Sequence, residues 1–476
     1  MGIYISYRER AKTISAVFVA ALVLIWPAIY NGYPLLYPDS MSYLQDGRRV
    51  ANSFSLHNFP TTYGGRSFIY CLGILPFHQN VTPWPILGLN AILTAYILWL
   101  VVRSIRRPTV LAYLLLIITL SFLTGLSWFV SFIMPDILGP LLYLCVYLIA
   151  FSRRDLSRTE TFIVAGIAWW AIASHPTHLI LAGLLCFFVP LVLILQRQPR
   201  RQWLGAFRLI AAILCLAALA QIALHTYLYG SPSLNGKRAP FLMARTIADG
   251  PGRWYLQQHC ADLNLSICDR VNNLPDNVAE FLWSPTGIWR TLSAAQQDQL
   301  RQEEMTVVLG AIRNYPWTML RISANHFWRQ LGAFGLYNYY PDPWILEQSD
   351  KTLPGSQAIY LGSRQALQTL HEKFFTGIQE WIVRAALIAV FTWGIVLRAS
   401  PTHRIYGLLA VIMFVVIVNA SVSGILSNVE DRYQSRVIWL VPLIAGLGAI
   451  EWLTRQTFSQ PSKAELSSAS KTVANL

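Results

Sequence analysis

Charged residues are scarce in this chain of 476 residues. Asp, Glu, Lys and Arg make up 13% of it, whereas 54% of the residues are apolar and the mean hydropathy is +0.43. An ordinary soluble domain is about 25% charged, so this composition excludes a water-soluble globular protein and indicates a membrane protein. The apolar excess also excludes intrinsic disorder and a collagenous chain. Six cysteines are too few for a disulfide-dense secreted scaffold.

Several enzyme motifs are also missing. The chain has no glycine-rich phosphate loop, no HExxH zinc motif and no nucleophile-elbow serine. Any chemistry must therefore come from polar residues that are arranged in another way.

Ten apolar stretches are typical of membrane-spanning helices, because about 20 such residues cross about 30 Å of hydrocarbon. They cover residues 14–32, 83–102, 108–126, 136–152, 160–174, 178–195, 207–228, 380–397, 405–426 and 437–453. The first is not a cleavable signal peptide, since Trp26, Pro27 and Tyr30 stand where small residues of a cleavage site would be. We therefore expect an all-α polytopic membrane protein with about ten transmembrane helices.

Basic residues are distributed unevenly among the loops between these stretches. With a cytoplasmic N-terminus, the cytoplasmic segments hold 18 Lys and Arg, and the four short outer loops hold five. These five are Arg48, Arg49, Arg66, Arg432 and Arg436. The positive-inside rule then predicts that both termini are cytoplasmic. The net charge of +14 is accordingly a topology signal, which points to membrane lipids as partners and not to nucleic acid.

The apolar stretches divide the chain into four regions. These are an N-terminal membrane module (1–228, seven helices) with a first outer loop (33–82), an extracytoplasmic domain (229–379), a C-terminal membrane module (380–455, three helices) and a disordered cytoplasmic tail (456–476). The long domain is expected to be mainly helical. Its stretch 316–335 mixes tryptophan, leucine and arginine at helical spacing and predicts an amphipathic helix at the membrane surface.

Two cysteines lie in the expected extracytoplasmic domain. Cys260 and Cys268 would there meet an oxidising compartment, which favours a local disulfide. Two unpaired thiols are the alternative. A zinc site that includes His259 is less favoured, because no second pair of ligands is in sight.

Polar residues collect at the outer ends of the predicted helices. They follow the first, third, fifth and ninth helices, in the stretches 37–44, 134–136, 174–178 and 430–436. In the predicted topology all four lie on one side of the membrane. Carboxylates, imidazoles and guanidiniums at one depth could surround a polar cavity whose substrate arrives from the lipid.

Each of these residues also has a simpler structural interpretation. Two aspartates could cap helices, two histidines could be plain interface residues, and two arginines could anchor a helix at the lipid headgroups. The residues concerned are Asp39 and Asp136, His175 and His178, and Arg432 and Arg436. Anchoring by arginine is unexpected where the short outer loops contain so few basic residues. That distribution favours phosphate binding, because a guanidinium presents a planar fork of donors to phosphate oxygens.

The order of these motifs resembles that of the GT-C-fold membrane glycosyltransferases. The resemblance rests on Tyr37-Pro38-Asp39-Ser40 with Tyr43 after the first helix, Met134-Pro135-Asp136 at the start of a helix, and Asp431-Arg432-Tyr433 before the last helix. It covers the helical scaffold and not the extracytoplasmic domain. Those enzymes move a sugar from a polyprenyl-phosphate carrier to an acceptor on the outer face, typically with inversion.

The resemblance implies a role for each matching residue. Asp39 would be the catalytic base, and Arg432 and Arg436 would hold the phosphate of the departing lipid. His175 or His178 would add a hydrogen bond to that phosphate. The remaining expected substrate-binding residues are Tyr37, Tyr43, Asp136, Asp431 and Tyr433.

The resemblance also suggests the surroundings of the reaction. Several branches of the family have a second acid where this chain has Ser40, so we expect no metal, and no cofactor either. The expected partners are a polyprenyl-phosphate sugar donor and a glycan or lipid acceptor of the cell envelope. The expected location is the inner (cytoplasmic) membrane, with the active site facing the periplasm.

Two other functions stay open. An O-antigen-type glycan ligase or polymerase would use Arg245, Arg253, His259 or His326 of the long domain and would not need Asp39. A transporter or flippase would place ionisable groups near the bilayer midplane and often has broken helices in paired halves. Here the ionisable groups gather at helix ends instead.

Overall fold

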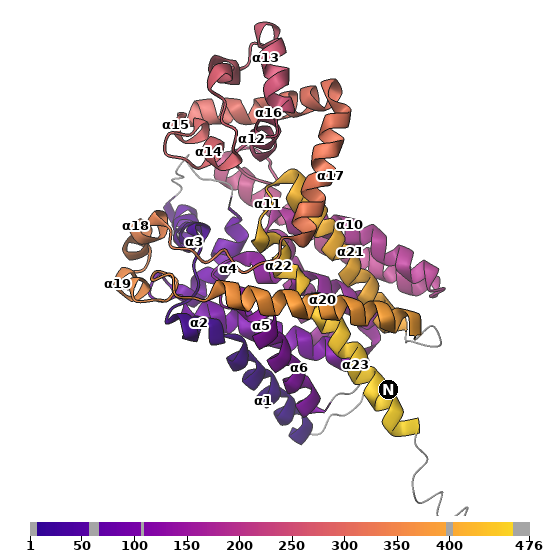
Figure 1. Cartoon of the computed structure of the whole chain (residues 1–476). Helices are drawn as coiled ribbons and strands as arrows, with labels where there is room; N and C mark the ends of the chain where they lie inside the picture. Colours follow the sequence, from indigo (N-terminus) through magenta and orange to yellow (C-terminus); the bar gives the residue numbers. More distant parts are fainter. Residues whose placement is uncertain (1–6, 57–65, 106–108, 397–402, 460–476) are drawn as a thin grey trace, which may run out of the picture.

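The computed structural model describes residues 7–56, 66–105, 109–396 and 403–459, and this part of the chain is built from helices (Figure 1). Its one isolated β-bridge pairs Leu35 with Phe132. Seven helical segments are long and apolar enough to cross a membrane: Ala11–Asn31, Trp84–Ile105, Pro176–Leu195, Arg200–Tyr229, Glu372–Thr392, Arg404–Leu426 and Asp431–Glu451. The protein is therefore an all-helical, multi-pass membrane protein.

The other three predicted spans are helical but shorter. They are α6 (Val110–Leu123), α8 (Leu138–Phe151), which follows the 3-10 turn η1 (Pro135–Ile137), and α9 (Arg158–Ser174). The total of ten spans and the direction of the chain across the membrane stay predictions. The predicted disordered tail begins within α23 (Leu440–Ser459), and the rest of it lies outside the described residues.

Prolines break the first and last predicted spans in two. Pro27 stands in the first turn of α2 (Trp26–Asn31), directly after α1 (Tyr7–Leu24). Pro442 has no N–H to donate to the carbonyl of Ile438, four residues earlier. Helix α22 (Asp431–Ile438) ends at this residue, before α23 begins. The indole of Trp439 lies at this break and donates a hydrogen bond of 2.8 Å to the carbonyl of Arg436. The break separates the short helix α22 from the apolar helix α23.

Most of the remaining helices of the bundle are α3 (Pro38–Leu56), α4 (Phe68–His78), α5 (Trp84–Ile105), α7 (Leu126–Val130), α10 (Pro176–Leu195), α11 (Arg200–Tyr229), α20 (Glu372–Val396) and α21 (His403–Leu426). A separate lobe, at the top of Figure 1, contains α12 (Phe241–Ala248), α13 (Pro251–Leu263), α14 (Val278–Leu282), α15 (Ile288–Thr291), α16 (Ala294–Asn314) and α17 (Pro316–Gly332). Helix α17 lies within the stretch 316–335 that the sequence predicts to be helical.

Residues 229–379 contribute to two hydrophobic cores. The lobe has its own core, with Met243, Leu256, Phe281 and Val307 among its members. Helices α18 (Pro343–Thr352) and α19 (Ser356–Leu361) instead share the large core of the membrane bundle, through residues such as Ile345 and Tyr360. The segment after α17 therefore returns to the bundle and lies against the first helices of the chain.

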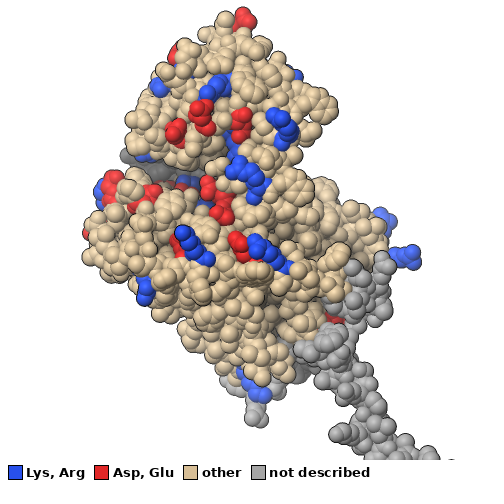
Figure 2. Space-filling view, viewed as in Figure 1, with Lys and Arg blue, Asp and Glu red and all other residues tan. Residues whose placement is uncertain are grey.

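The surface agrees with a membrane location. On the face shown in Figure 2, most acidic and basic side chains are scattered over the lobe and the band below it, and a belt with few charged side chains follows. Many large apolar side chains of the bundle helices are exposed, including Phe162, Phe187 and Phe391, which are 81%, 71% and 72% exposed. A bilayer would cover such a belt.

Candidate active site

Two arginines on successive turns of α22 share one buried carboxylate. Asp136, in the turn before α8, accepts a hydrogen bond from the Nη1 atom of Arg436 at 3.3 Å, and its Oδ1 atom lies 3.6 Å from the Nε atom of Arg432. The Arg432, Arg436 and Asp136 side chains are 8%, 2% and 2% exposed. Asp136 does not cap a helix in the structure. Its carboxylate contacts the guanidiniums of α22, and the turn η1 has no side-chain cap.

These guanidiniums retain unused donors. The Nη1 atom of Arg432 and the Nε atom of Arg436 are buried and make no hydrogen bond in the described part of the protein. Arg436 also donates to the side chain of Asn419 on α21 at 3.3 Å. Two positive charges thus face a single carboxylate, and a buried donor without a partner costs about 1–3 kcal/mol. Such a site is suited to an anion.

Aromatic rings surround Arg432. Its guanidinium lies 4.3 Å from the ring centre of Tyr37 and 5.2 Å from that of Tyr433. The ring of Tyr37 contacts that of Tyr340, from the segment that leads to α18. The π faces attract the cation and restrict the guanidinium to this position. Tyr37 and Tyr433 are therefore arranged around the arginine that the sequence singles out.

Asp39 lies in the first turn of α3 and forms an ion pair with Arg66. Their side chains are only 16% and 26% exposed, respectively. The guanidinium of Arg66 also lies over the ring of Tyr43, 5.9 Å from its centre. Asp39 and Tyr43 are one helical turn apart, so both reach the same partner. Asp39 also interacts electrostatically with Arg432. The residue predicted to be the base and the arginine predicted to bind phosphate therefore share one electrostatic environment.

Asp39 is not the cap of α3. The helix starts at Pro38, and the residue whose side chain accepts the free backbone N–H of Tyr37 is Ser40, at 2.9 Å. In a capping box a Glu or Gln side chain at the third helical position satisfies this donor, and here the hydroxyl of Ser40 does so. The carboxylate of Asp39 is thereby left for Arg66.

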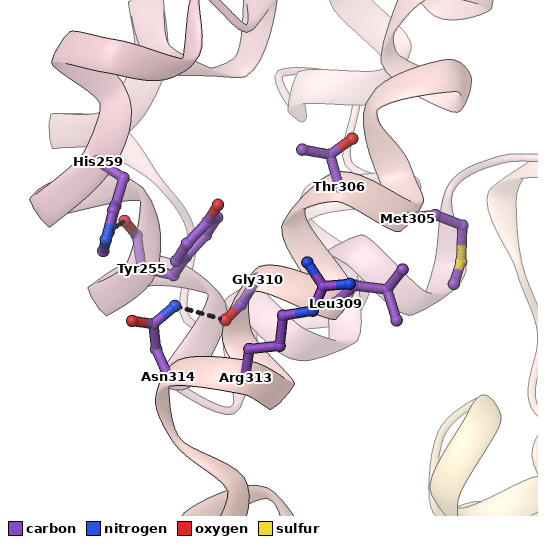
Figure 3. A pocket seen from close by; sticks show the side chains of 8 residues that line it. All are labelled: Tyr255, His259, Met305, Thr306, Leu309, Gly310, Arg313 and Asn314. Atoms are coloured by element: carbon purple, nitrogen blue, oxygen red, sulfur yellow. Dashed lines mark hydrogen bonds between the residues drawn. The ribbon is translucent and has the colours of Figure 1, made fainter.

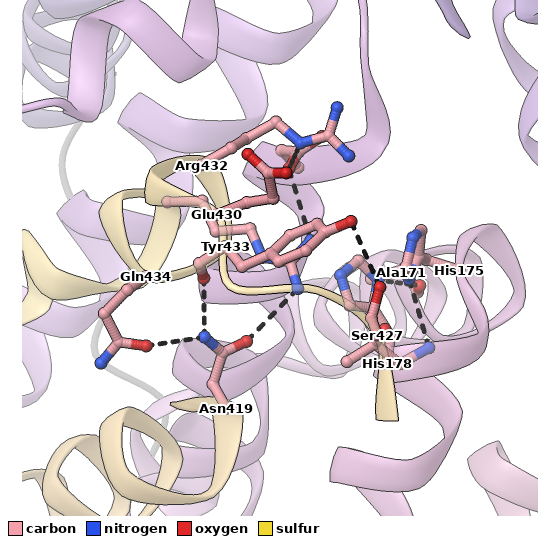
Figure 4. A network of polar contacts seen from close by, with 12 residues as sticks. Ala171, His175, His178, Asn419, Ser427, Glu430, Arg432, Tyr433 and Gln434 are labelled. Atoms are coloured by element: carbon pink, nitrogen blue, oxygen red, sulfur yellow. Dashed lines mark hydrogen bonds and ion pairs between the residues drawn. The ribbon is translucent and has the colours of Figure 1, made fainter. Parts of the chain in front are cut away.

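His175 and His178 lie side by side, with ring centres 5.2 Å apart, at the start of α10 (Figure 4). The Nδ1 atom of His178 meets the carbonyl of Ala171 at 2.8 Å, so Nδ1 must carry the proton and the buried Nε2 atom offers a lone pair. In His175 the Nδ1 atom accepts from the backbone N–H of Thr177 at 3.2 Å, which leaves Nε2 as a donor when the ring is neutral. His175 thus has an N–H available for an anion.

Electrostatics keep His175 neutral. Burial, and after it the charges of His178 and Arg436, hold the pKa of His175 well below its usual range. Arg432 and Arg66 act in the same direction. The ring therefore remains uncharged near pH 7 and can donate a hydrogen bond without adding another buried charge.

Asp431 has a different role. Its carboxylate accepts the backbone N–H of Gly335 at 2.8 Å and fixes the start of α22 to the end of the lobe. The side chain of Gln330 on α17 bonds both backbone groups of Glu430 at 2.9 Å. Asp431 therefore orients α22 and is not directed at the other residues of the cluster.

The segment just before α3, which leads to Asp39, is held by residues that are distant in the sequence. The side-chain amide of Gln365, which is fully buried, donates to the carbonyl of Leu36 at 2.6 Å and accepts its N–H at 3.0 Å. Asn31 in turn accepts the backbone N–H of Gln365 at 2.7 Å. These bonds replace the partners that a neighbouring strand would give to Leu36.

Searches against protein-family models, curated proteins and solved structures found no match. The fold and the site geometry are therefore the basis for any functional assignment. Within the described ranges, no group of three or more His, Cys, Asp or Glu side chains is arranged to hold a metal ion. The expected absence of a metal stays a prediction.

The basic residues that a glycan ligase would use lie in the lobe, and two of them meet at its junction with the bundle. Arg245 donates to Asp249 at 2.9 Å, to the carbonyl of Ser427 at 2.7 Å and to that of Gly424 at 3.2 Å. His326 bonds the other oxygen of Asp249 at 3.0 Å. Since all three nitrogens of Arg245 have partners within the protein, this residue joins the lobe to α21.

Two cavities also involve the lobe. One, of about 180 Å³, adjoins this junction and is lined by Arg245, Asp249 and His326 among others. The other, of about 430 Å³, lies between α13 and α16, and Figure 3 shows His259 and Tyr255 of α13 on one side of it and Arg313 of α16 on the other. Neither cavity is lined by Asp39 or Arg432. In the same lobe, Cys260 and Cys268 form a disulfide.

Sequence reasoning missed the role of Arg66 and Asn419. Arg66 is one of the five basic residues of the short outer loops, and that scarcity was a usable signal. Asn419 lies within an apolar helix, where a polar side chain is expected to face a partner. Its amide donates to the carbonyl of Tyr433 at 2.6 Å and thereby orients α22.

Proposed function

We propose that this protein is a membrane glycosyltransferase that moves a sugar from a polyprenyl-phosphate donor to an acceptor at the extracytoplasmic face. The observation that carries the proposal is the pair of buried guanidiniums with unused donors, Arg432 and Arg436, in the electrostatic environment of Asp39. The unused donors would bind a phosphate, and Asp39 would act as the base beside it. The proposed orientation, with both termini in the cytoplasm, rests on the distribution of basic residues.

In the proposed reaction Asp39 removes the proton of the acceptor hydroxyl while that oxygen forms a bond with the anomeric carbon. The bond between this carbon and the phosphate oxygen breaks, and its electron pair leaves with the lipid phosphate. Arg432 and Arg436 would stabilise the charge that develops on the leaving group, with His175 as a further donor. Attack from the face opposite the phosphate inverts the anomeric configuration.

The burial of the cluster supports a substrate that arrives from the lipid. All residues of the anion site lie at the ends of apolar helices and are largely shielded from water. Low local polarity strengthens each charge interaction with a phosphate. A polyprenyl chain could remain in the bilayer while its phosphate reaches the arginines.

The test is transfer by the purified full-length protein in lipid nanodiscs. A panel of labelled polyprenyl-phosphate hexoses and pentoses is supplied with a membrane extract that contains acceptors. We expect transfer with at least one donor, and a loss of about 10²–10⁴-fold in Asp39→Asn, the range typical of general-base catalysis. Asp350→Asn on α18 serves as a carboxylate control, because among the described residues the Asp350 side chain bonds only the backbone N–H of Gln357.

Other outcomes would favour the alternatives. Retained transfer in Asp39→Asn, together with loss in His326→Ala, would overturn the assignment of Asp39 and support a glycan ligase. Uptake of a labelled solute into vesicles without glycosyl transfer would support a transporter.

A further inference from the structure

Three of the five basic residues in the short outer loops converge on the same cluster. Arg432 and Arg436 face Asp136, and Arg66 faces Asp39. Arg66 lies close enough to Arg432 that the two positive charges oppose each other, and both act on His175. Three guanidiniums therefore meet two carboxylates. An anion placed among them would relieve this repulsion.

The position of Arg66 is set by the fold. The next residue, Ser67, caps α4 by accepting the N–H of Tyr70 at 3.3 Å, and its hydroxyl donates to the carbonyl of Ala173 at 2.6 Å. Ala173 immediately precedes Ser174 and the turn that contains His175 and His178. The backbone at Arg66 is thus fixed against α9, and its side chain extends toward α3 and α22.

The ion pair with Arg66 limits what Asp39 can do. A carboxylate oxygen that accepts from a guanidinium is less available to take a proton from an acceptor hydroxyl. In the structure Asp39 is paired with Arg66. A ligand that took over this guanidinium would release the base of the proposed reaction.

We propose that Arg66 is a third phosphate-binding arginine, which leaves Asp39 for the donor phosphate and so frees the base only when donor is bound. This inference rests on the proposed function, because it assigns Asp39 as the base and a phosphate as the ligand. The donor phosphate is a diester whose two free oxygens share one negative charge, and these oxygens can accept hydrogen bonds from a guanidinium fork. It can therefore compete with Asp39 for the same guanidinium, and the lipid phosphate monoester that leaves gains further negative charge.

The exchange would couple donor binding to base activation. Water that enters the site without donor would meet a carboxylate held by Arg66. Acceptor activation would then begin only after the leaving group is in place. Tyr43, whose ring lies beneath the guanidinium of Arg66, contacts the residue that moves.

The experiment measures anion binding separately from transfer. The probe is farnesyl phosphate, a short analogue of the lipid phosphate that leaves, with inorganic phosphate as a second ligand, added to the full-length protein in nanodiscs and followed by calorimetry. We expect Arg66→Gln to bind farnesyl phosphate about tenfold more weakly and Asp39→Asn about tenfold more tightly, as for an ordinary coupling between two sites. Arg66→Lys should keep part of the affinity, because it keeps the charge and loses the fork of donors.

The double variant separates exchange from simple charge repulsion. If Asp39 acts through Arg66, Asp39→Asn has no further effect on affinity in the Arg66→Gln background. If it acts only by its negative charge, the tenfold gain persists there, and the exchange is wrong. Arg48→Gln is the matched control, since Arg48 is also an outer-loop arginine but lies further along α3, and we expect unchanged binding.

Two results distinguish this inference from the proposed function. If no donor supports transfer but the pattern of binding constants holds, then Arg66 exchanges partners in a protein with another activity. If Asp39→Asn abolishes transfer but neither variant of Arg66 changes binding, the glycosyltransferase stands and Arg66 has no part in the phosphate site. Unfolding temperatures of all variants are measured. If Arg66→Gln does not fold, the affinity of Arg66→Lys for farnesyl phosphate decides whether Arg66 takes part in the phosphate site.

Discussion

The carboxylate of Asp136 lies 3.3 Å from the Nη1 atom of Arg436, although the two residues are 300 positions apart in the chain. Both side chains are 2% exposed. The pair joins the start of α8 to α22, and it is the contact that brings the motif near residue 135 to the one near residue 432. Loss of Asp136 would leave two buried guanidiniums, those of Arg432 and Arg436, without their shared carboxylate.

We predict that Asp136→Asn lowers the free energy of unfolding by about 3–5 kcal/mol, the usual cost of removing one partner from a buried ion pair. Asp155→Asn is the control, because Asp155 pairs with Arg404 at 2.7 Å but is 37% exposed, and exposed pairs contribute about 0–1 kcal/mol. Denaturant unfolding in mixed micelles measures both. Equal losses in the two variants would contradict the prediction.

A methyl group at position 139 should disturb the histidine pair. A Cβ atom built on Gly139 would lie 2.9 Å from the Nε2 atom of His178, so Gly139→Ala forces the ring to move. We expect a loss of about 1–3 kcal/mol in stability and lower transfer activity. In Gly183→Ala, on the same helix as His178, the new methyl group meets nothing within 4 Å, and helix propensity should raise stability slightly. Thermal unfolding of Gly139→Ala and Gly183→Ala measures the difference in stability.

Asp46 should make stability depend on pH. Burial raises the pKa of Asp46 to about 6, and the nearby Arg49 only partly opposes this shift. The folded protein therefore prefers the protonated carboxyl. This preference stabilises fully below the ordinary pKa of about 4 and is lost as the pH rises through 6.

Asp46→Asn removes that titration. We expect the unfolding temperature of wild type, relative to the variant, to fall between pH 4 and pH 6 and then to stay constant up to pH 8. The corresponding free energy is at most about 3 kcal/mol. Thermal scans of both proteins at each pH measure it, and a difference that does not vary with pH would refute the assignment.

The thiols of the lobe should be protected. Cys260 and Cys268 form a disulfide, so a membrane-impermeant maleimide should label them in intact protein only after reduction. The double variant Cys260→Ala/Cys268→Ala should lower the stability of the lobe by about 2 kcal/mol. Labelling before reduction, read by mass spectrometry of the peptide that spans both residues, would show that the thiols are free.

The helices of this protein were predictable because the apolar runs that form them are local. Each predicted span corresponds to helical residues, and Pro27 and Pro442 explain why two spans are divided. The helix bounds follow the apolar runs, as in α9, which covers Arg158–Ser174 where the sequence predicts 160–174. The partners of the polar residues beside the helices do not follow from these runs: Asp136 pairs with Arg436 on α22, and His175 accepts the N–H of Thr177. Hydropathy alone does not encode these pairings.

The candidate site was predictable in part. The scarcity of basic residues outside drew attention to Arg432 and Arg436, and the structure brings both to Asp136. The partner of Asp39 was not predicted, because the pair with Arg66 depends on how α4 packs against α9. The sequence marks Ser40 only as the position where several GT-C branches have a second acid, whereas in the structure its hydroxyl accepts the backbone N–H of Tyr37.

The bonds between Gln365 and Leu36 have a consequence for biosynthesis. These residues are 329 positions apart, so the ribosome completes the first helices long before the amide that fixes the loop beside Asp39 exists. The last arginines arrive later still, with α22. Contacts between such distant residues close late in folding. A nascent or truncated chain would therefore carry an unfinished site, and only a chain completed through α22 would contain all of its residues.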